Sequence, residues 1–504
     1  MSQYPFFWSF LGPAFAYTSA MKADPVYGPV LEETVRHALA FLTSLPQSSV
    51  AATATLETLR ERLGRPLPAG PRDPSVVIDQ LVRDVEGGLT GNAGGRFYAW
   101  VIGGSLPAAL AADWMTSAWD QNAGMYAVAP AAAVVEEVCG RWLLDLLGLP
   151  PQASFALVTG CQMAHVTCLA AARNGVLARQ GWDVEQRGLM GAPPIRVITG
   201  DQRHGTIERA LRLLGLGRDC VVDIPVAANG QLTAAALAPV LAASPGQPTI
   251  VLLQAGDLNT GSFDPFLEII PLAHQSGAWV HVDGAFGLWA AASPAHRHFT
   301  EGIEGADSWA TDGHKWLNVP YDCGYAFVTD REAHYRSMGH HANYLTHSEA
   351  ARDQVDWNPE YSRRARGFAT YAALASLGRE GVARLVAGCC EHALALVTRA
   401  GALPGVEVLH VPHINQGLLR FPDPAPGATA QDHDRHTEAV VARVIASGEA
   451  MFACTTWRGR RCMRVSVCGW ATSETDIERA VQAINQALRS ATTRQPAPAR
   501  TSPS

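Results

Sequence analysis

Between residue 96 and about residue 330 the chain alternates helical stretches with short β-branched runs, and this alternation restricts the fold more than any other feature. The runs are FALVTG, IRVITG, CVVDIPV, TIVLLQAG, WVHVDG and YAFVTD. Apolar strands separated by helices predict an α/β fold, with a largely parallel sheet covered by helices on both faces. Ligands of such sheets bind beyond the carboxyl ends of the strands, so we expect chemistry in the loops after Val158, Thr199, Gln254 and Val282.

The flanking composition predicts the domain organisation. Helical periodicity and then a glycine-rich segment predict an N-terminal helical arm over residues 1–95. The α/β pattern predicts a large domain over residues 96–375, and a smaller α+β domain over residues 376–490. The Pro-rich end, residues 491–504, has the composition of a disordered tail.

Charge and cysteine usage exclude several classes of protein. A net charge of -7 argues against nucleic-acid binding. The ten cysteines form no CxxC pair, which favours reduced thiols in the cytoplasm over a disulfide framework or a zinc site. Residues 1–20 are apolar, but no basic residue precedes them and Pro5 and Pro13 interrupt them. We therefore expect an arm or an extension before a start at Met21 rather than a signal peptide, and no later run predicts a membrane span.

A lysine and a carboxylate carry the most informative chemistry. Asp283 lies in HVDGAFG, and Lys315 follows 32 residues later in DGHKW. A buried lysine whose pKa is lowered by desolvation can attack an aldehyde and form a Schiff base. A carboxylate at a strand end can keep a pyridine nitrogen protonated, which makes the ring an electron sink. Ala285 is small enough to let such a ring lie against the backbone.

The segment TGCQMAHVTCLAAAR predicts a phosphate site, because a strand end and a glycine precede a helix of small residues. The backbone amides of Gly160, Cys161 and Gln162 would point at the phosphate from the start of that helix. Together with Lys315 and Asp283, this pattern predicts pyridoxal 5'-phosphate (PLP) as the cofactor.

Five segments resemble the PLP-dependent group II amino-acid decarboxylases: TGCQMA, DQRHGTIERALRLLGLG, HVDGAFG, DGHKW and SRRARGFATYAALASLGREG. They occur in the order and spacing of that family, over residues 80–485. The family includes aromatic-L-amino-acid, tyrosine, glutamate and 2,4-diaminobutyrate decarboxylases. The resemblance implies the fold type I architecture, with a mostly parallel seven-stranded sheet, and a homodimer with active sites at the subunit interface.

The resemblance assigns roles to residues by position. Lys315 resembles the Schiff-base lysine, and Asp283 resembles the partner of the pyridine nitrogen. His204 resembles the histidine that stacks on the outer face of the ring, with Ala285 on the inner face. Further cofactor positions are Gly160, Cys161, Gln162, Asp257, Asp312 and His314. The implied substrate positions are Phe97, Tyr98, Trp100, Asn122 and Tyr344.

Three departures from the family pattern leave the reaction outcome open. Asp257, in Gly-Asp-Leu, stands where many members have Gly-Thr-Thr, and it could act near the ring hydroxyl or accept hydrogen bonds from its own loop. Asp312 stands where many have Asn, and an acid suits a phosphate poorly unless it orients His314. An ungapped alignment places Gln354 where aromatic decarboxylases carry a proton-donating loop tyrosine, and the nearest tyrosines are Tyr344 and Tyr361.

These observations predict decarboxylation of an aromatic or other non-standard L-amino acid to the amine and carbon dioxide. An aldehyde synthase, an aminotransferase or another Cα-bond lyase on the same scaffold is the first alternative. A catalytically silent binding subunit is the alternative from another class. The pairs His296/His298 and His340/His341 lack metal-ligand spacing, so we expect no metal. We expect only one or two residues of the aromatic cluster around Trp100 to line a pocket.

Overall fold

The computed structural model describes residues 26–339 and 351–492, and these form two compact units. The first unit comprises residues 26–45 and 52–89, and the second comprises residues 46–51 and those from 90 onward. The first unit holds helices α1 (Gly28–Ser44), α2 (Leu56–Leu63) and α3 (Pro74–Asp84). Neither α1 nor α2 buries a residue, so much of the apolar surface of this unit remains exposed.

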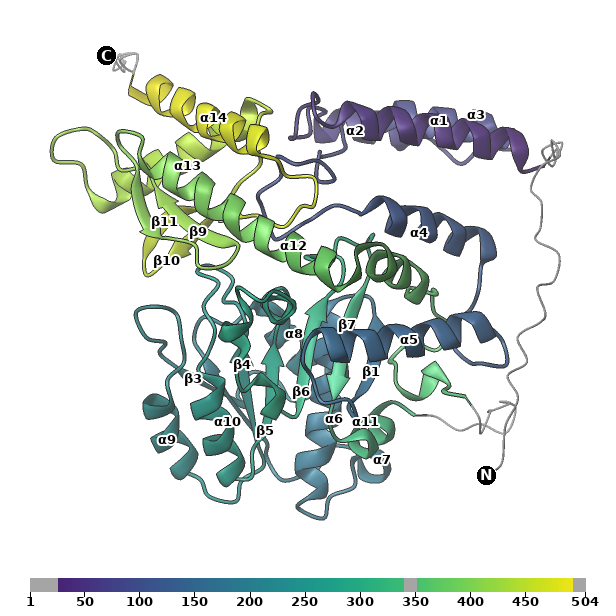
Figure 1. Ribbon diagram of the computed structural model, residues 1–504, viewed down its shortest axis with the longest axis vertical. Helices are drawn as coiled ribbons and strands as arrows, with labels where there is room; N and C mark the ends of the chain where they lie inside the picture. The colour runs from purple at the N-terminus through teal and green to yellow at the C-terminus, as the bar shows by residue number, and fades with distance from the viewer. Residues whose placement is uncertain (1–25, 340–350, 493–504) are drawn as a thin grey trace, which may run out of the picture. The chain divides into compact units, whose positions relative to one another are not determined.

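A seven-stranded mixed sheet is the centre of the second unit (Figure 1). Its strands, in spatial order, are β1 (Ser154–Val158), β7 (Gly324–Val328), β6 (Ser308–Asp312), β5 (Trp279–Asp283), β4 (Thr249–Gln254), β2 (Arg196–Gly200) and β3 (Val221–Ile224). Strand β7 is antiparallel to both neighbours, and every other pair is parallel. The predicted fold class is confirmed, and six of these strands lie on the predicted runs. We missed β6 because its sequence, SWATD, is short and largely polar although it is fully buried.

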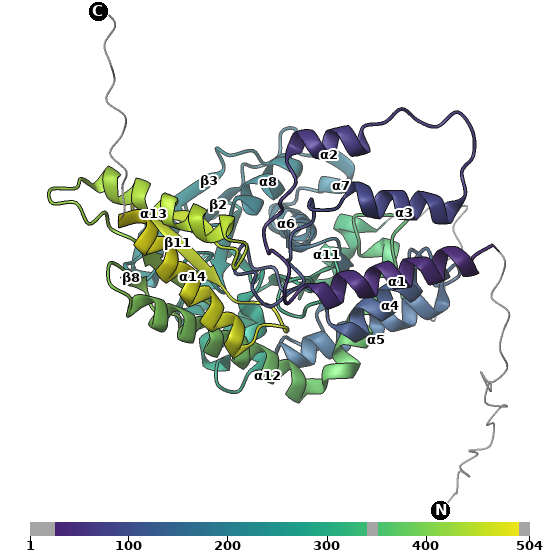
Figure 2. The ribbon, with the colours of Figure 1, turned by 90° about the horizontal axis from the view of Figure 1, so that it is seen from above.

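Helices cover both faces of this sheet because its strands are apolar on both sides. In β4, Ile250 and Leu252 belong to one hydrophobic cluster, while Val251 and Leu253 belong to another. The first cluster includes residues of α6 (Cys161–Ala178), α8 (Gly205–Leu213) and α11 (Arg331–Met338). The second includes residues of α5 (Pro130–Leu146), α9 (Ala234–Ala242) and α10 (Phe266–Gln275). Figure 2 shows α6 and α8 on one side of this unit, and α5 with α12 on the other.

The C-terminal part of the same unit has a four-stranded antiparallel sheet. Its strands, in spatial order, are β10 (Ala453–Trp457), β11 (Arg460–Ser466), β9 (Gln416–Arg420) and β8 (Glu407–His410). The accompanying helices are α12 (Gly367–Gly401), α13 (Ala430–Ala446) and α14 (Glu474–Thr492). Shorter elements connect the parts: α4 (Pro107–Trp119), α7 (Val184–Arg187), and the 3-10 helices η1 (Gly287–Ala292), η2 (Arg297–Thr300), η3 (Ile303–Gly305) and η4 (Gln354–Asp356).

Helix α12 spans residue 375, where we predicted a domain boundary, and it is bent at Gly378, whose φ is 57°. Within the described residues it is the one helix long and apolar enough to cross a membrane, by length and composition alone. It packs against α4, α5 and α14. A buried core helix meets the same criterion, so the finding is weak evidence for a membrane span.

A buried ion pair fastens α5 to the segment before α12. The Nη1 of Arg363 lies 2.6 Å from Oε1 of Glu136, and both side chains are fully buried. Arg363 also donates hydrogen bonds to the carbonyl oxygens of Ala123 and Leu157. Because Leu157 precedes the last residue of β1, this pair fixes the strand that leads into the predicted phosphate loop.

We expect Arg363→Met to lower the free energy of unfolding by about 3–5 kcal/mol, because it leaves the Glu136 carboxylate buried without its cation. Thermal and urea denaturation would measure the loss. The matched control is Arg379→Met, which breaks the exposed pair with Asp145 and should change stability little. Equal effects of the two substitutions would contradict this account of the buried pair.

Candidate active site

A cavity opens at the carboxyl edge of the parallel strands, where the sequence predicted chemistry. Its lining residues come from the segment around residue 100, the start of α8, the ends of β4 and β5 with the loops that follow them, the loop after β6, and β11: Trp100, Val101, His204, Gln254, Gly256, Leu258, Asp283, Ala285, Phe286, Lys315 and Arg464. Gln254 and Asp283 are register partners in neighbouring strands, which places their side chains together at this edge. The structure thus brings Lys315, Asp283, Ala285, His204 and Trp100 around one cavity.

Lys315 lies in the turn that follows β6. Its Nζ is 3.0 Å from Oδ2 of Asp312, the last residue of that strand. Asn318 holds the turn in place with a left-handed backbone, φ 55°. The Nδ2 of Asn318 donates hydrogen bonds to the carbonyl oxygens of Lys315, at 3.0 Å, and Cys468, at 2.9 Å. The lysine turn is therefore tied to the segment after β11.

The charge state of Lys315 differs from our prediction. Burial alone would lower the pKa of its ammonium, as we expected. However, the neighbouring carboxylates, first of all that of Asp312, raise the pKa of Lys315 above its usual value. The prediction of a lowered pKa was wrong because it left out the ion pair with Asp312. The lysine in this structure is a paired cation.

Asp283 ends β5 and presents its carboxylate to the cavity. Oδ1 accepts a hydrogen bond from the backbone N–H of Ala285 at 3.1 Å, and Nε2 of His165 lies 3.5 Å from Oδ2. Burial alone would raise the pKa of this carboxyl, but His165, and then His204 and Lys315, hold the pKa of Asp283 below its usual range. Asp283 therefore remains an anion at neutral pH, as a partner for a protonated pyridine must.

The start of α6 lies beside Asp312. Gly160 caps the helix, and a Cβ there would come within 2.9 Å of His314 and 3.3 Å of Oδ1 of Asp312. The same oxygen accepts the backbone N–H of Cys161 at 2.5 Å and lies 3.2 Å from Nε2 of His314. Asp312 thus contacts His314 and Lys315 together, which explains how an acid is accommodated at this position. The phosphate role of Gly160, Cys161 and Gln162 stays a prediction.

Cys161 is not a nucleophile in this arrangement. Its position at a helix N-terminus would lower its pKa. Burial, reinforced by the carboxylates of Asp312 and Asp283, instead raises the pKa of its thiol well above the usual value. The side chain is therefore a neutral thiol.

His204 caps α8 at the mouth of the cavity. Its Nδ1 accepts the backbone N–H of Thr206 at 3.3 Å, which fixes the ring at the start of the helix. The surrounding protein lowers the pKa of the imidazole, although the charge of Asp283 opposes this shift. At neutral pH the ring is therefore mostly neutral.

Asp257 does not line the cavity, which corrects the role that we predicted for it. Its Oδ1 accepts hydrogen bonds from the backbone N–H groups of Asn259, at 2.9 Å, and Thr260, at 2.7 Å. The side chain is fully buried and closes its own loop, while its neighbours Gly256 and Leu258 face the cavity.

Three predicted substrate residues also lie outside the cavity lining. Tyr98 is completely buried and stacks on Phe452, at a centroid distance of 5.3 Å. Phe97 packs in a small cluster with Val50 and Met451. Asn122 is exposed and accepts the backbone N–H of Arg363 at 3.1 Å. Local sequence could not reveal these side-chain directions.

Two residues of the predicted proton-donor region can be placed. Gln354 is fully buried and donates a hydrogen bond to the carbonyl oxygen of Ala133 at 3.2 Å, so it is not part of the cavity. Tyr361 does not line the cavity. Tyr344 and the pair His340/His341 lie outside the described residues.

Sequence reasoning missed His165, His281 and Arg464. His165 follows Cys161 by four residues, which places both on one face of α6, and His281 precedes Asp283 by two residues on one face of β5. Both spacings are visible in the amino-acid sequence. Arg464 comes from a distant strand, and only the folded chain brings it to the cavity. One further signal was available: Lys22 and Lys315 are the two lysines of the sequence.

The cavity, with an amine, an ionised carboxylate, an imidazole and a small residue, defines a site for an aldehyde cofactor with a basic ring. Residues 58–422 match the family model described as the pyridoxal-dependent decarboxylase conserved domain, and the chain belongs to this family.

Relatives agree with this assignment. The chain is 28% identical over 388 residues to L-2,4-diaminobutyrate decarboxylase of Rhizobium meliloti (strain 1021), covering 76% of this chain and 75% of that protein. It is 28% identical over 444 residues to tryptophan decarboxylase 1 of Oryza sativa subsp. japonica, covering 82% and 84%. The crystal structure of Oryza sativa TDC with PLP and tryptamine matches with a TM-score of 0.87 at 24% identity, covering 94% of this chain and 99% of that one.

The chain is therefore a PLP-dependent carboxy-lyase that acts on an amino acid, and its cofactor is pyridoxal 5'-phosphate, as predicted. The residues present fit this cofactor. Lys315 would hold the aldehyde carbon, the anionic Asp283 would face the pyridine nitrogen, and Ala285 leaves space for the ring. When bound, the cofactor supplies an electron sink for the carbanion that decarboxylation creates.

We expect Asp312→Asn to speed the incorporation of PLP into cofactor-free protein at a fixed neutral pH by about tenfold or more. Only the unprotonated amine attacks the aldehyde, and the lost carboxylate no longer raises the pKa of Lys315. As pH increases, the rate of PLP incorporation should therefore begin to rise at a lower pH in the variant than in the wild type. Absorbance of the bound cofactor, followed against pH, measures this shift.

The charge-matched control is Asp322→Asn, which removes the half-exposed partner of Arg366. It should leave the pH profile of PLP incorporation unchanged. A profile of Asp312→Asn that coincides with that of the wild type would contradict the role given to the Asp312–Lys315 pair.

Proposed function

We propose that this decarboxylase acts on an L-amino acid with an aromatic or other non-standard side chain and releases the amine and carbon dioxide. The observation that carries the proposal is the apolar part of the cavity lining. Trp100, Val101, Leu258 and Phe286 line the same cavity as Lys315. Such surfaces favour a substrate with an apolar side chain, because binding removes apolar surface of both partners from water.

The residues of the cavity have different roles in the proposed reaction. The anionic Asp283 would favour protonation of the ring that faces it. Lys315 would hold the cofactor aldehyde until the substrate amine replaces it, and would release the product amine by returning to the cofactor. His204, mostly neutral at neutral pH, can accept or deliver a proton at the cavity mouth. Apolar residues such as Leu258 and Phe286 solvate a substrate carboxylate poorly, which favours its loss as neutral carbon dioxide.

Arg464 supports a second possibility for the substrate. Arg464 lines the cavity, its Nη1 donates to the carbonyl oxygen of Leu258 at 3.2 Å, and its buried Nε has no hydrogen-bond partner among the described residues. A guanidinium with free donors can bind a carboxylate in a fixed geometry. An acidic substrate is therefore the competing choice, and diaminobutyrate, the substrate named for one relative, is a third.

The decisive experiment is a product assay with PLP-loaded protein and carboxyl-labelled tryptophan, tyrosine, phenylalanine, 2,4-diaminobutyrate and aspartate. We expect stoichiometric amine and labelled carbon dioxide from an aromatic member, and none from Lys315→Ala. Preferred turnover of aspartate would instead assign Arg464 to the substrate. Aldehyde, ammonia and peroxide would show an oxidative outcome, and a keto acid would show transamination.

Trp100 provides a direct test of the aromatic assignment. It is 56% exposed at the cavity with a left-handed backbone, φ 54°, so it presents a large apolar surface to an entering molecule. We expect Trp100→Ala to raise KM for the aromatic substrate about tenfold, with a smaller effect on kcat. Trp182→Ala, a control beside Arg187 and away from the cavity, should leave both constants unchanged. A Trp100→Ala enzyme with wild-type KM would refute the assignment.

We also propose that the protein is a homodimer. The helices of the first unit support this, because apolar side chains such as Leu31, Leu39 and Leu81 are about half exposed there. These side chains come from α1 and α3, which contact each other, and exposed apolar side chains gathered in this way mark interaction surfaces. Light scattering of the purified protein measures the state directly.

A cytoplasmic location is the last part of the proposal. All ten cysteines are free thiols, and most are buried. A reducing compartment keeps such thiols free. Cell fractionation would test the location.

A further inference from the structure

A line of buried side chains runs from Asp283 into the protein, on the side away from the cavity. Nε2 of His165 lies 3.5 Å from Oδ2 of Asp283, and Nδ1 of His165 lies 2.9 Å from Nε2 of His281. Nδ1 of His281 lies 2.9 Å from Oγ of Ser308, its register partner in β6. Oγ of Ser308 accepts the indole N–H of Trp279 at 2.9 Å.

Every member of this line behind Asp283 is fully buried. Buried polar groups are costly without partners, so each hydrogen must find an acceptor. None of these groups is part of the cavity lining, and the chemistry described above does not use them.

Trp279 sets the direction of the line, because an indole nitrogen can only donate. Ser308 therefore accepts from Trp279, and its hydroxyl can also donate to Nδ1 of His281, 2.9 Å away. A neutral imidazole that accepts at one nitrogen donates at the other. His281 then donates from Nε2 to Nδ1 of His165, which leaves Nε2–H of His165 facing Asp283, at 3.5 Å, and the Sγ of Cys161, at 3.4 Å.

The charge of His281 agrees with this assignment. Burial, and then the neighbouring His165, lower the pKa of His281 to about 3, so its ring is neutral at neutral pH. A neutral His281 carries one ring proton, and the arrangement in which Ser308 donates to Nδ1 places that proton on Nε2, facing His165.

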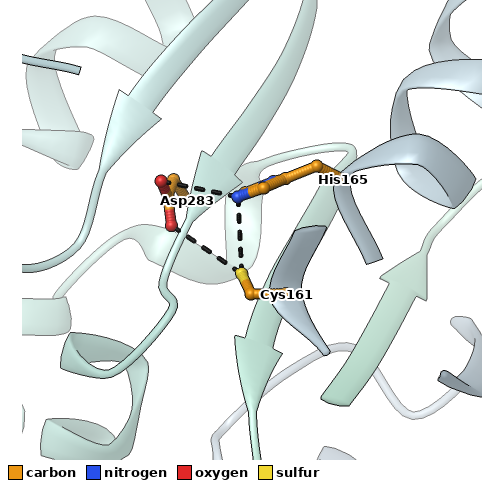
Figure 3. Close-up of side chains that lie close together, drawn as sticks. All are labelled: Cys161, His165 and Asp283. Carbon is orange, nitrogen blue, oxygen red and sulfur yellow. Dashed lines mark hydrogen bonds and ion pairs between the residues drawn. The ribbon is translucent and has the colours of Figure 1, made fainter. Parts of the chain in front are cut away.

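We propose that His165 is a positioning residue for Asp283: its Nε2–H, oriented by His281, Ser308 and Trp279, holds the carboxylate ionised and aimed at the cofactor ring. Figure 3 shows His165 and Cys161 approaching Asp283 together. The two side chains contact opposite oxygens, since Sγ of Cys161 lies 3.9 Å from Oδ1. The carboxylate is thus held by two side chains of α6 and by the backbone N–H of Ala285, just after β5.

The same three side chains could in principle ligate a metal ion. A thiolate would be required for this, and the burial that raises the pKa of Cys161 opposes its formation. A metal would also occupy the carboxylate that the pyridine nitrogen needs. The geometry therefore favours a hydrogen-bonded support for Asp283.

In metal sites, removing a residue that orients a ligand in this way typically lowers metal affinity or activity by about 10–100-fold. We expect a similar scale here. The proposal concerns cofactor binding, so it does not depend on which amino acid is the substrate.

The test compares His165→Leu with His165→Gln in PLP-loaded protein. Leucine fills similar space but cannot donate, so the dissociation constant of PLP should rise about tenfold or more, and the absorbance spectrum of bound PLP should change. Glutamine can donate to Asp283 and accept from His281, so it should restore both to near wild-type values. Equilibrium dialysis and spectrophotometry measure these quantities without any substrate.

His334→Leu is the matched control for burial. His334 is also a fully buried imidazole, bonded to Ser154 at 2.7 Å and to the carbonyl oxygen of Trp357 at 2.9 Å, but it lies away from the cavity. The His334→Leu substitution should lower thermal stability and leave the PLP affinity and the PLP absorbance spectrum unchanged. Equal losses of PLP affinity in His165→Leu and His334→Leu would reduce His165 to a structural residue and overturn the proposal.

Ser308→Ala keeps the test decisive if His165→Leu does not fold. It removes the hydroxyl that fixes the proton of His281, so the PLP spectrum should shift in the same direction with a smaller loss of affinity. Wild-type spectra and affinity in both Ser308→Ala and His165→Gln, with a bound zinc ion found by elemental analysis, would instead assign the cluster to a metal.

Discussion

The arrangement of the active site depends on charges that are buried at the carboxyl edge of the seven-stranded sheet. Each buried charge needs a compensating partner. The ammonium of Lys315 pairs with the carboxylate of Asp312 and feels the charge of Asp283, and each carboxylate also accepts a hydrogen bond from a backbone N–H. His165 and His314 contact one carboxylate each. Removing Asp312 or Lys315 would take the paired opposite charge from the other in a poorly solvated place.

The sheet register explains why these groups meet. Asp283 and Asp312 end neighbouring parallel strands, so they reach the same edge although 29 residues separate them in sequence. Helix α6 begins at that edge and contributes Cys161 and His165 on one face. Asn318 then ties the turn of Lys315 to the segment after β11. Cofactor chemistry is thus positioned by rigid elements, while the lining around Trp100 and Leu258 comes from loops.

Much of the site could be predicted because strand-end residues share an edge whatever the detailed packing. That argument pointed to the loops that hold Asp283, Ala285 and His204, while Lys315 was singled out by its flanking residues and by the family resemblance, and the structure brings all four to one cavity. The strand-end argument failed for Asp257, because local hydrogen bonds determine whether a loop side chain faces the cavity or its own backbone.

The remaining misses have other physical causes. Tyr98 and Trp100 lie two residues apart, yet one is in the core and the other at the cavity, and sequence does not show which. The line behind Asp283 depends on the register of β5 with β6, and Arg464 depends on how a distant strand packs. Strand β6 itself was missed because buried Ser, Thr and Asp side chains give no apolar pattern.

The most direct measurement of the central claim uses the small number of lysines. Lys22 and Lys315 are the two lysines of the chain, so reduction of the PLP-loaded protein with borohydride, digestion and mass spectrometry can assign the attachment point without ambiguity. The account predicts one phosphopyridoxyl-modified peptide that contains Lys315, with Lys22 unmodified. Modification of Lys22 alone, or no modified lysine in protein that retains the bound cofactor, would contradict it.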